Sequence, residues 1–276
     1  MYKGKIVVRL SGGLGNQLFM FAAAKQFSIR TNKELLVDEF TGFAFDHKFK
    51  RSPILGSFGF PYKKAPWYLY PLSFSKLFDI FKFFLPISRI NTFNNMNDPF
   101  NYIVYIDGYW QSQSYFLEIE SNIRQSYRNI LIGNNNAEAY RNIILKSVNS
   151  VAVHVRRFDL EHHSGRGVIG REYYKNAMEF LISQIGQCNF YVFSDRPEEV
   201  RKFLSLEKYS MNYINEGFSD IEEFHLMMSC DHFIIGDSTF SWWAAWLGVN
   251  LKKTVCFPKL NQRSNSKLDF PMSGWR

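Results

Sequence analysis

Short apolar runs alternate with amphipathic runs along the chain. Residues 6–10 predict a short buried strand, and residues 33–38 predict a second one. Between them, apolar positions recur at helical spacing from residue 16 to residue 30, at Leu18, Phe19, Ala22, Ala23 and Phe27. The order strand, glycine-rich turn, helix, strand is a βαβ unit and therefore predicts a parallel sheet.

The second half repeats this alternation. Helices are predicted at 171–185, which Gly186 would end, from Pro197, and from Ser219, which has capping-box spacing to Glu222. A further helix follows residue 236. Strands are predicted at 151–156, 189–195, 232–236 and 254–258. This half therefore predicts a second α/β unit.

The middle of the chain is less regular. Residues 41–100 are rich in Phe, Asn and Pro and predict an insertion with one or two helices. Strand character returns at 102–110, and a helix is expected at about 115–131. The polar cluster 132–139 is a candidate linker, with a further helix before residue 150. We therefore expect an N-terminal domain at 1–140 and a C-terminal domain at 148–276.

The stretch VAVHVRRFDL, residues 151–160, ends a predicted strand in positive charge. Strand residues alternate between faces, so His154 and Arg156 are expected on one side and Arg157 on the other. Arg156 could grip a leaving diphosphate, because a guanidinium suits phosphate geometry, and His154 could bind a base or ribose. The alternative is a structural ion-pair cluster, with Arg157 paired to Asp159.

Two further polar clusters follow predicted strands, where open parallel sheets bind their ligands. Ser238 and Thr239 begin a helix, where hydroxyls and free N–H groups form an anion site, although ordinary N-capping is the simpler interpretation. Asp195 either caps a helix or accepts hydrogen bonds from the N–H edge of a purine. The tryptophans of the helix, Trp242, Trp243 and Trp246, are expected mostly in the core.

The turn GGLGNQ, residues 12–17, partly matches a dinucleotide-binding fingerprint, with Asp38 at the end of the next strand. However, Leu18 stands where the third glycine belongs, and no G-K-[ST] follows to make a phosphate-binding P-loop. The turn would instead let the backbone approach a ligand. Asn16 and Gln17 would then meet a polar substrate such as a sugar.

The composition of the chain narrows the classes of ligand that it is expected to bind. Lys and Arg number 33 and Asp and Glu 25, giving a net charge of +8, which favours phosphate-bearing ligands. The basic residues form no block, which counts against nucleic acid. Three distant cysteines indicate neither disulfides nor zinc, and each is expected to be buried near a strand. No H-x-x-x-H pair or D-x-D is present, so we expect a site without metal, in which Arg neutralises charge.

Four motifs together, GGLGNQLF, GYWQS, HVRRFD and STFSWWAAWL, resemble those of the bacterial α-1,2-fucosyltransferases of glycosyltransferase family eleven. The matching segments occur in the same order as in the family, from Ile6 to about Val255, and the match is weakest over 41–100. HVRR-x-D is also similar to a segment of α-1,6- and protein O-fucosyltransferases. The sequence departs from the family pattern at Phe158, Leu160 and Ala244, which puts the acceptor in doubt more than the donor.

The resemblance implies an α/β protein of GT-B type, in which two Rossmann-like domains face across a cleft. The C-terminal domain would bind GDP-fucose and the N-terminal domain an acceptor sugar, with inverting transfer to a 2-hydroxyl and neither metal nor other cofactor. We expect galactose in a surface polysaccharide or O-antigen unit as the acceptor. The donor-binding residues implied are Arg156 at the β-phosphate, His154 and Asp195 at the guanosine, and Ser238, Thr239 and Ser241 at phosphate.

The base that takes the acceptor proton is open. Asp159 is the first candidate, Glu161 and His162 are alternatives, and the N-terminal half offers Asp38, Glu39 and Asp46. Three other functions compete with fucosyl transfer. They are an NAD-dependent oxidoreductase that uses Gly13, Gly15 and Asp38, a non-catalytic protein that binds sugars or lipid headgroups, and an RNA-binding protein, which the scattered charge disfavours.

The segment 68–87 is the most apolar of the chain. Lys76, Asp79 and Lys82 interrupt it, so it predicts an amphipathic surface segment and not a spanning helix. The N-terminal apolar run is too short for a signal peptide, and no anchor like that of the animal relatives is seen. We expect a bacterial cytoplasmic enzyme that contacts the inner membrane peripherally through 68–87 and acts on lipid-linked units.

Overall fold

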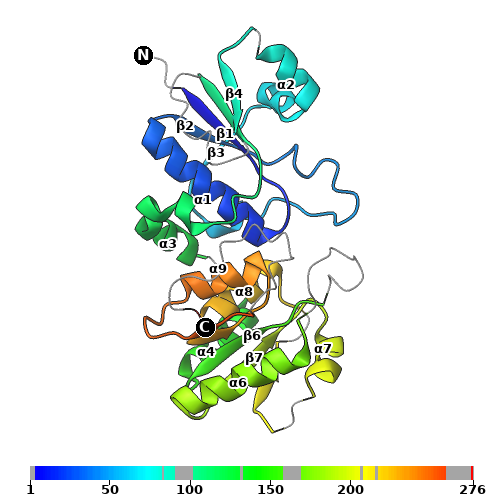
Figure 1. Cartoon of the computed structure of the whole chain (residues 1–276), viewed down its shortest axis with the longest axis vertical. Helices are drawn as coiled ribbons and strands as arrows, with labels where there is room; N and C mark the ends of the chain where they lie inside the picture. The colour runs from blue at the N-terminus through cyan, green and yellow to red at the C-terminus, as the bar shows by residue number, and fades with distance from the viewer. Residues whose placement is uncertain are drawn as a thin grey trace. The chain divides into compact units, whose positions relative to one another are not determined.

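The computed structural model describes residues 4–82, 84–90, 102–130, 133–157, 169–205, 208–214, 217–258 and 275. The chain divides into two compact units, Met1–Asn129 and Ile130–Arg276 (Figure 1). Each unit contains one five-stranded sheet, and all strand pairings recorded in the described residues are parallel. The predicted α/β class with two parallel sheets is therefore confirmed.

The first sheet has the strand order β3-β2-β1-β5-β4. Its strands are β1 Lys5–Arg9, β2 Glu34–Asp38, β3 Lys63–Lys64, β4 Ile87–Ile90 and β5 Ile103–Ile106. Helix α1, Leu14–Thr31, connects β1 to β2 and ends at Asn32, which has the left-handed φ of 52° common at helix ends. The βαβ unit predicted for the start of the chain is present.

Two apolar groups stabilise the first unit. In one, Val7, Leu36 and Tyr105 of the sheet pack with side chains of the 3₁₀ helix η2, Trp67–Ser73, and of α2, Ser75–Phe81. In the other, Tyr127 of α3, Glu120–Arg128, contacts the ring of Phe58 in η1, Leu55–Phe58, and donates a hydrogen bond to the carbonyl of Leu18. Two short 3₁₀ helices, η4 Gln113–Tyr115 and η5 Leu117–Ile119, precede α3.

Residues 41–90 are not a separate insertion, which differs from the expectation for 41–100. They supply both edge strands of the first sheet, β3 and β4, as well as η1, η2 and α2. The two strands have 2 and 4 residues, which is too short for an alternating pattern to show. Residues 91–100 lie outside the described residues.

The second sheet has the order β10-β9-β6-β7-β8. Its strands are β6 Ser150–His154, β7 Asn189–Phe193, β8 Met211–Tyr213, β9 His232–Ile234 and β10 Val255–Cys256. The chain therefore builds outward from β6 in one direction and then returns to β6's other side with β9. Doubly wound sheets bind ligands at the carboxyl ends of the strands where the order reverses, here between β6 and β9.

The helices of the second unit are α4 Asn135–Lys146, α6 Arg171–Ile185, α7 Pro197–Leu204, α8 Asp220–Met228 and α9 Thr239–Leu247. The starts of α6, α7 and α8, the turn at Gly186 and the Ser219–Glu222 capping box agree with the sequence predictions. Helix α6 packs on β6 and β7 through Tyr174, Met178 and Leu181. All three α9 tryptophans and all three cysteines are buried, and the cysteines are free, as expected.

Of the polar stretch 132–139, Asn134 is the N-cap residue of α4 and residues 135–139 are the first residues of that helix. The Asn134 side chain accepts the backbone N–H of Asn136, which caps α4. Clustered asparagines are equally common in loops and at caps, so the sequence could not separate these two roles. Helix α4 belongs to the second unit, so the first unit ends before the expected residue 140.

Candidate functional site

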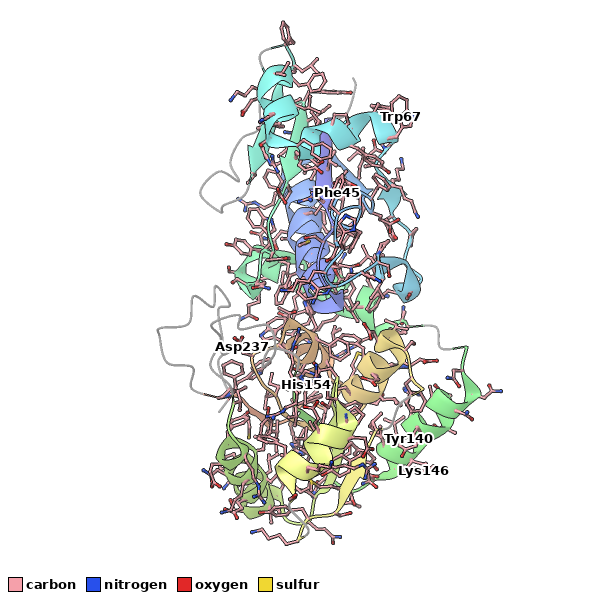
Figure 2. The ribbon with its side chains drawn as sticks, turned by 90° about the vertical axis from the view of Figure 1, so that its right-hand side faces the viewer. Phe45, Trp67, Tyr140, Lys146, His154 and Asp237 are labelled. Carbon is pink, nitrogen blue, oxygen red and sulfur yellow. The ribbon has the colours of Figure 1, made fainter. Side chains whose placement is uncertain are left out.

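The three polar clusters predicted from the sequence lie at the carboxyl ends of three neighbouring strands in the second unit. His154 at the end of β6 pairs in register with Phe193 of β7, and Val153 pairs with Ile234 of β9. Gly236, which comes soon after β9, lies near the end of β6. A Cβ atom on Gly236 would be 4.0 Å from the His154 carbonyl oxygen. Figure 2 labels His154 and Asp237 at this part of the sheet. The clusters therefore form one site.

His154 is a buried, neutral imidazole. Its ring centroid lies 5.8 Å from that of Phe240, and its Nδ1 atom is buried with no hydrogen-bond partner among the described residues. Burial, assisted by the charge of Arg156, lowers the pKa of His154 to about 4, although Asp195 acts in the opposite direction. A buried ring nitrogen without a protein partner is able to bind a ligand group.

The two arginines differ from the alternating arrangement expected on a strand, because β6 ends at His154. Arg156 is half-buried in the segment after the strand, where its charge acts on His154. The Arg157 guanidinium lies 4.3 Å from the ring of Phe203, and its backbone N–H donates to Asp195 Oδ1 at 2.9 Å. The other residues named in this loop, Asp159, Glu161 and His162, lie outside the described residues.

Two carboxyl groups lie in this part of the second unit, Asp195 after β7 and Glu223 at the start of α8. Asp195 is exposed and joins the β6 and β7 loops by accepting the Arg157 N–H. Glu223, in the first turn of α8, is close enough for the charges of Asp220 and Asp195 to act on it. Burial first, and these two charges second, raise the pKa of Glu223 to about 7. Glu223 was not expected at the site, because the neighbouring Glu222 has capping-box spacing to Ser219 and nothing in the sequence singles out Glu223 beside it.

At the start of α9, the hydroxyl groups are not equivalent. Ser238 is the N-cap residue, but its side chain makes no cap bond, and its Oγ is buried without a partner among the described residues. Thr239 is partly exposed at the first helical position. Ser241 is fully buried and donates to the Ser238 carbonyl at 3.3 Å, which occupies its hydroxyl within the helix. Ser238 and Thr239 are thus available to an anion, and Ser241 is not.

In the first unit, the strand order reverses between β1 and β5. The loops that follow these two strands come together there. The turn after β1 contains Gly12 with a left-handed φ of 73°, where a Cβ would lie 2.7 Å from Asn16 Nδ2. Gln111, after β5, donates to Asn16 Oδ1 at 2.7 Å. Trp110 beside it has a φ of 50°, which is strained for a bulky residue.

Gln17 does not fit its expected role in binding an acceptor. Its side chain is fully buried, Nε2 donates to the carbonyls of Gly12 and Ser52, and Oε1 accepts the N–H of Ile54. It therefore fixes the loop and has no group left for a sugar. Asn16 is partly exposed and keeps its position beside the turn.

The N-terminal carboxylates are also occupied. Asp38 is buried and accepts from the backbone of Phe40 and from the backbone and hydroxyl of Thr41, and also from the Tyr105 hydroxyl. A dinucleotide ribose would need these acceptor positions, so the structure counts against the oxidoreductase alternative.

Glu39 and Asp46 are likewise bonded within the first unit. Glu39 pairs with Lys64 at 2.6 Å and also accepts from Tyr62, and Asp46 accepts backbone N–H groups at Phe49 and Arg51. Together with Asp38, these carboxylates make poor candidates for a base, because a base must be free to meet a substrate hydroxyl.

Over the described parts of the chain, no group of three or more His, Cys, Asp or Glu side chains could hold a metal ion. Within the same residues, no helix has the length and apolar character needed to cross a membrane.

Comparison with known proteins identifies the class and then the family. The fucosyltransferase NodZ from Bradyrhizobium superposes with a TM-score of 0.54 at 14% identity, over 88% of this chain and 92% of NodZ. POFUT1 in complex with GDP gives 0.52 at 13% identity, over 92% and 98%. Two parallel-sheet units with this similarity define a glycosyltransferase fold of GT-B type.

The family follows from sequence. The profile of glycosyl transferase family 11 matches residues 80–273. An α-1,2-colitosyltransferase from Escherichia coli is 29% identical over 273 residues, 92% of this chain and 93% of the relative. The O-antigen biosynthesis glycosyltransferase WbnK from Escherichia coli is 25% identical over 296 residues, 96% and 98%. The chain belongs to glycosyltransferase family 11.

Proposed function

We propose that the chain transfers L-fucose from GDP-fucose to the 2-hydroxyl of an acceptor sugar, with inversion. The observation that carries the proposal is the placement of His154, Asp195 and Ser238 after the neighbouring strands β6, β7 and β9, of which β6 and β9 flank the point where the second sheet reverses its order. The names of the relatives support it, because one is an α-1,2-colitosyltransferase, and NodZ has been crystallised with GDP and soaked with GDP-fucose.

The second unit would hold the nucleotide. Arg156 would bind the β-phosphate, with Ser238 Oγ, Thr239 and the free N–H groups of the first α9 turn as further donors. His154, Asp195 and Glu223 would bind the guanosine. A guanine presents adjacent N–H donors on one edge, and two carboxyl groups beside one another are suitable acceptors for them.

The reaction would be a single in-line displacement. The acceptor oxygen bonds to the anomeric carbon while the bond from that carbon to the β-phosphate oxygen breaks, and its electron pair leaves with GDP. Negative charge thus grows on the diphosphate, and one preorganised donor there is commonly worth about 3–4 kcal/mol. Asp159 is proposed as the base that takes the hydroxyl proton, since Asp38, Glu39 and Asp46 are engaged elsewhere.

The first unit would bind the acceptor beside Asn16. One relative named for O-antigen biosynthesis supports an oligosaccharide acceptor, for which we propose a galactose-containing, lipid-linked unit at the cytoplasmic face of the inner membrane. The proposal needs no metal ion or cofactor, because the arginine and the helix start neutralise the leaving group. Transfer that continues unchanged in excess EDTA would agree with this, and full loss restored by Mn²⁺ would contradict it.

A donor screen by calorimetry tests the nucleotide site. GDP is expected to bind more tightly than UDP, CDP or NAD, and Arg156→Ala is expected to weaken GDP binding about 100-fold, since a charge-assisted bidentate contact is lost. Arg201→Ala, in which the removed guanidinium lies over the Tyr213 ring at 4.4 Å, is the matched control and should leave GDP affinity unchanged. GDP binding that survives Arg156→Ala at full strength would overturn the assignment.

One observation favours a second donor. The relative with 29% identity is named for colitose, which is fucose without its 3-hydroxyl group. A site built to hydrogen bond that hydroxyl rejects the deoxy sugar by up to about 10⁴-fold, whereas an apolar site discriminates weakly. Comparing kcat/KM for GDP-fucose and GDP-colitose therefore decides between the two donors.

A further inference from the structure

Exposed apolar side chains concentrate on one part of the first unit. More than half of the large apolar residues that the structure records as exposed lie between residues 40 and 85. They include Phe45, Trp67 and Phe84, which are 69%, 77% and 80% exposed. Single exposed apolar residues are normal, but a concentration of them marks an interaction surface. Figure 2 shows Trp67 at the margin of this unit.

Helix α2 presents an apolar stripe outward. Phe78 is its only residue buried in the core, whereas Leu77, Ile80 and Phe81 are exposed. Phe84 follows one turn later, where its N–H donates to the Phe81 carbonyl. These four positions are spaced i, i+3, i+4 and i+7, which places them along one side of a helical path. Lys76, Asp79 and Lys82 are adjacent to these positions in the sequence but lie outside the stripe, as in helices that lie on a membrane surface.

The loop after β2 is continuous with this region. The ring of Phe45 contacts that of Phe74, directly before α2, at a centroid distance of 6.3 Å. The ring of Phe40 stacks on that of Tyr70 in η2 at 5.3 Å. Trp67 and Tyr68 form an edge-on pair at the start of η2. Residues 40–45 and 67–84 therefore belong to one apolar surface.

The charge of this surface is positive. Residues 40–85 include seven Lys or Arg residues and two Asp residues. Within the described structure Lys48, Lys50, Arg51 and Lys76 form no ion pair with a carboxylate. Lys48 and Arg51 instead lie over the Phe49 ring at 5.1 and 4.6 Å. Basic groups beside exposed aromatic rings match the phosphates and the boundary layer of an anionic bilayer. A protein interface would be depleted in lysine.

We propose that residues 40–82, 84 and 85 of the first unit form a docking surface for an anionic lipid bilayer. The aromatic rings, Trp67 and Phe84 foremost, enter the headgroup layer, while Lys48, Lys50, Arg51 and Lys76 contact lipid phosphates. This surface extends beyond the segment 68–87 to the loop after β2. The inference deepens the proposed function and rests on it for its purpose, because a lipid-linked acceptor would be met at that bilayer.

Vesicle sedimentation of the full chain tests the surface without any sugar present. Binding to phosphatidylcholine vesicles with about one third phosphatidylglycerol is expected to exceed binding to phosphatidylcholine alone by at least about tenfold. Raising the salt from about 50 to about 500 mM should weaken it, because the charges are exposed. Equal binding to both vesicles, or no binding, overturns the proposal. So does a stable dimer that masks the surface.

Matched variants locate the contact. Trp67→Ser with Phe84→Ser, and separately Lys48→Glu with Lys76→Glu, should each reduce vesicle binding about tenfold or more. The controls Leu251→Ser and Lys146→Glu change exposed residues of the second unit and should stay within about twofold. Equal losses in the controls overturn the assignment. Unchanged GDP affinity shows that each variant is folded, and it reports separately on the nucleotide site.

Tryptophan fluorescence tests directly whether Trp67 inserts into the bilayer. Trp67 is exposed, whereas Trp110, Trp242, Trp243 and Trp246 are buried. Brominated lipid tails should therefore quench part of the emission of the wild type, and Trp67→Phe should abolish that part. Quenching that persists undiminished in Trp67→Phe would contradict insertion at this position.

Discussion

Gln111 donates a hydrogen bond from Nε2 to Oδ1 of Asn16 at 2.7 Å and so joins the loops after β5 and β1. Both loops lie where the strand order of the first sheet reverses. The bond fixes which way the Asn16 amide points, and the neighbouring Trp110 has a strained backbone. Asn16 is therefore held in place before any ligand arrives.

Removing this hydrogen bond should lower the rate of sugar transfer and leave the affinity for the nucleotide unchanged. In Gln111→Ala we expect kcat to fall about tenfold with unchanged GDP affinity, because Asn16 loses its orientation. Gln125→Ala, an exposed change on α3, is the control. A double-mutant cycle with Asn16→Ala should give a coupling energy of about 1 kcal/mol in urea unfolding. Strictly additive effects would show that the bond does not form in solution.

Ser238 and Ser219 stand at equivalent helix positions but should respond oppositely to alanine. Glu222 accepts both the N–H and the hydroxyl of Ser219, so Ser219→Ala should cost about 1 kcal/mol of stability. Ser238 Oγ makes no such cap, so Ser238→Ala should be neutral or stabilising while GDP affinity falls about tenfold. Calorimetry and thermal melting measure both quantities. A Ser238→Ala variant that is destabilised yet binds GDP normally would make Ser238 purely structural.

Stability should fall on acidification through His154. Its pKa is lowered to about 4 in the folded chain, mainly by burial, so the unfolded chain binds more protons between about pH 6.5 and pH 4. The contribution of His154 to the free energy of unfolding is thus complete above the pKa that His154 has in the unfolded chain, and it decreases as the pH falls below that value. Urea unfolding from about pH 7.5 to about pH 5 should lose about 2 kcal/mol through this group.

His154→Gln should remove that share of the pH dependence. A remainder is expected, because burial also lowers the pKa of His225 to about 4. An identical pH dependence in the wild type and the variant would mean that His154 is not buried as a neutral group.

Gly42 should be intolerant of any side chain. A Cβ atom there would lie 1.8 Å from the carbonyl oxygen of Leu10, which is backbone and cannot move aside. Gly42→Ala should therefore cost about 3 kcal/mol or more in urea unfolding. Gly13→Ala is the control, since no atom lies within 4 Å of its Cβ, and it should change stability by about 0.5 kcal/mol. Similar values for both would contradict the close approach of Gly42 to Leu10.

A sharper test of the proposed guanosine contact uses Glu223, whose pKa is raised to about 7. If its carboxylate accepts guanine N–H groups, GDP affinity should rise with pH through about 7 as the group ionises. Glu223→Gln should remove this dependence. Asp220→Asn, the neighbouring acid, is the comparison. A pH profile that is the same in wild type and Glu223→Gln would exclude the contact.

The sequence predicted long, periodic elements well. Helices α1 and α6 and the three polar strand ends around His154 follow from spacing alone, because apolar periodicity and polar residues directly after an apolar run are local signals. Strands β3 and β4 were missed, since a strand of 2 or 4 residues is defined by its partner and not by its own pattern. Gln17 was misjudged for a similar reason. Its partners Ser52 and Ile54 are distant in sequence, so only the folded chain shows that its amide is occupied.

The division between Asn129 and Ile130 leaves every recorded strand pairing inside one unit or the other. A hybrid gene joined at this point would therefore break no ladder of either sheet. Recombination among related genes could exchange the first unit while the second unit, with the site proposed for the nucleotide, is inherited intact. Such shuffling offers a simple route by which a family can change one half of its molecules and keep the other.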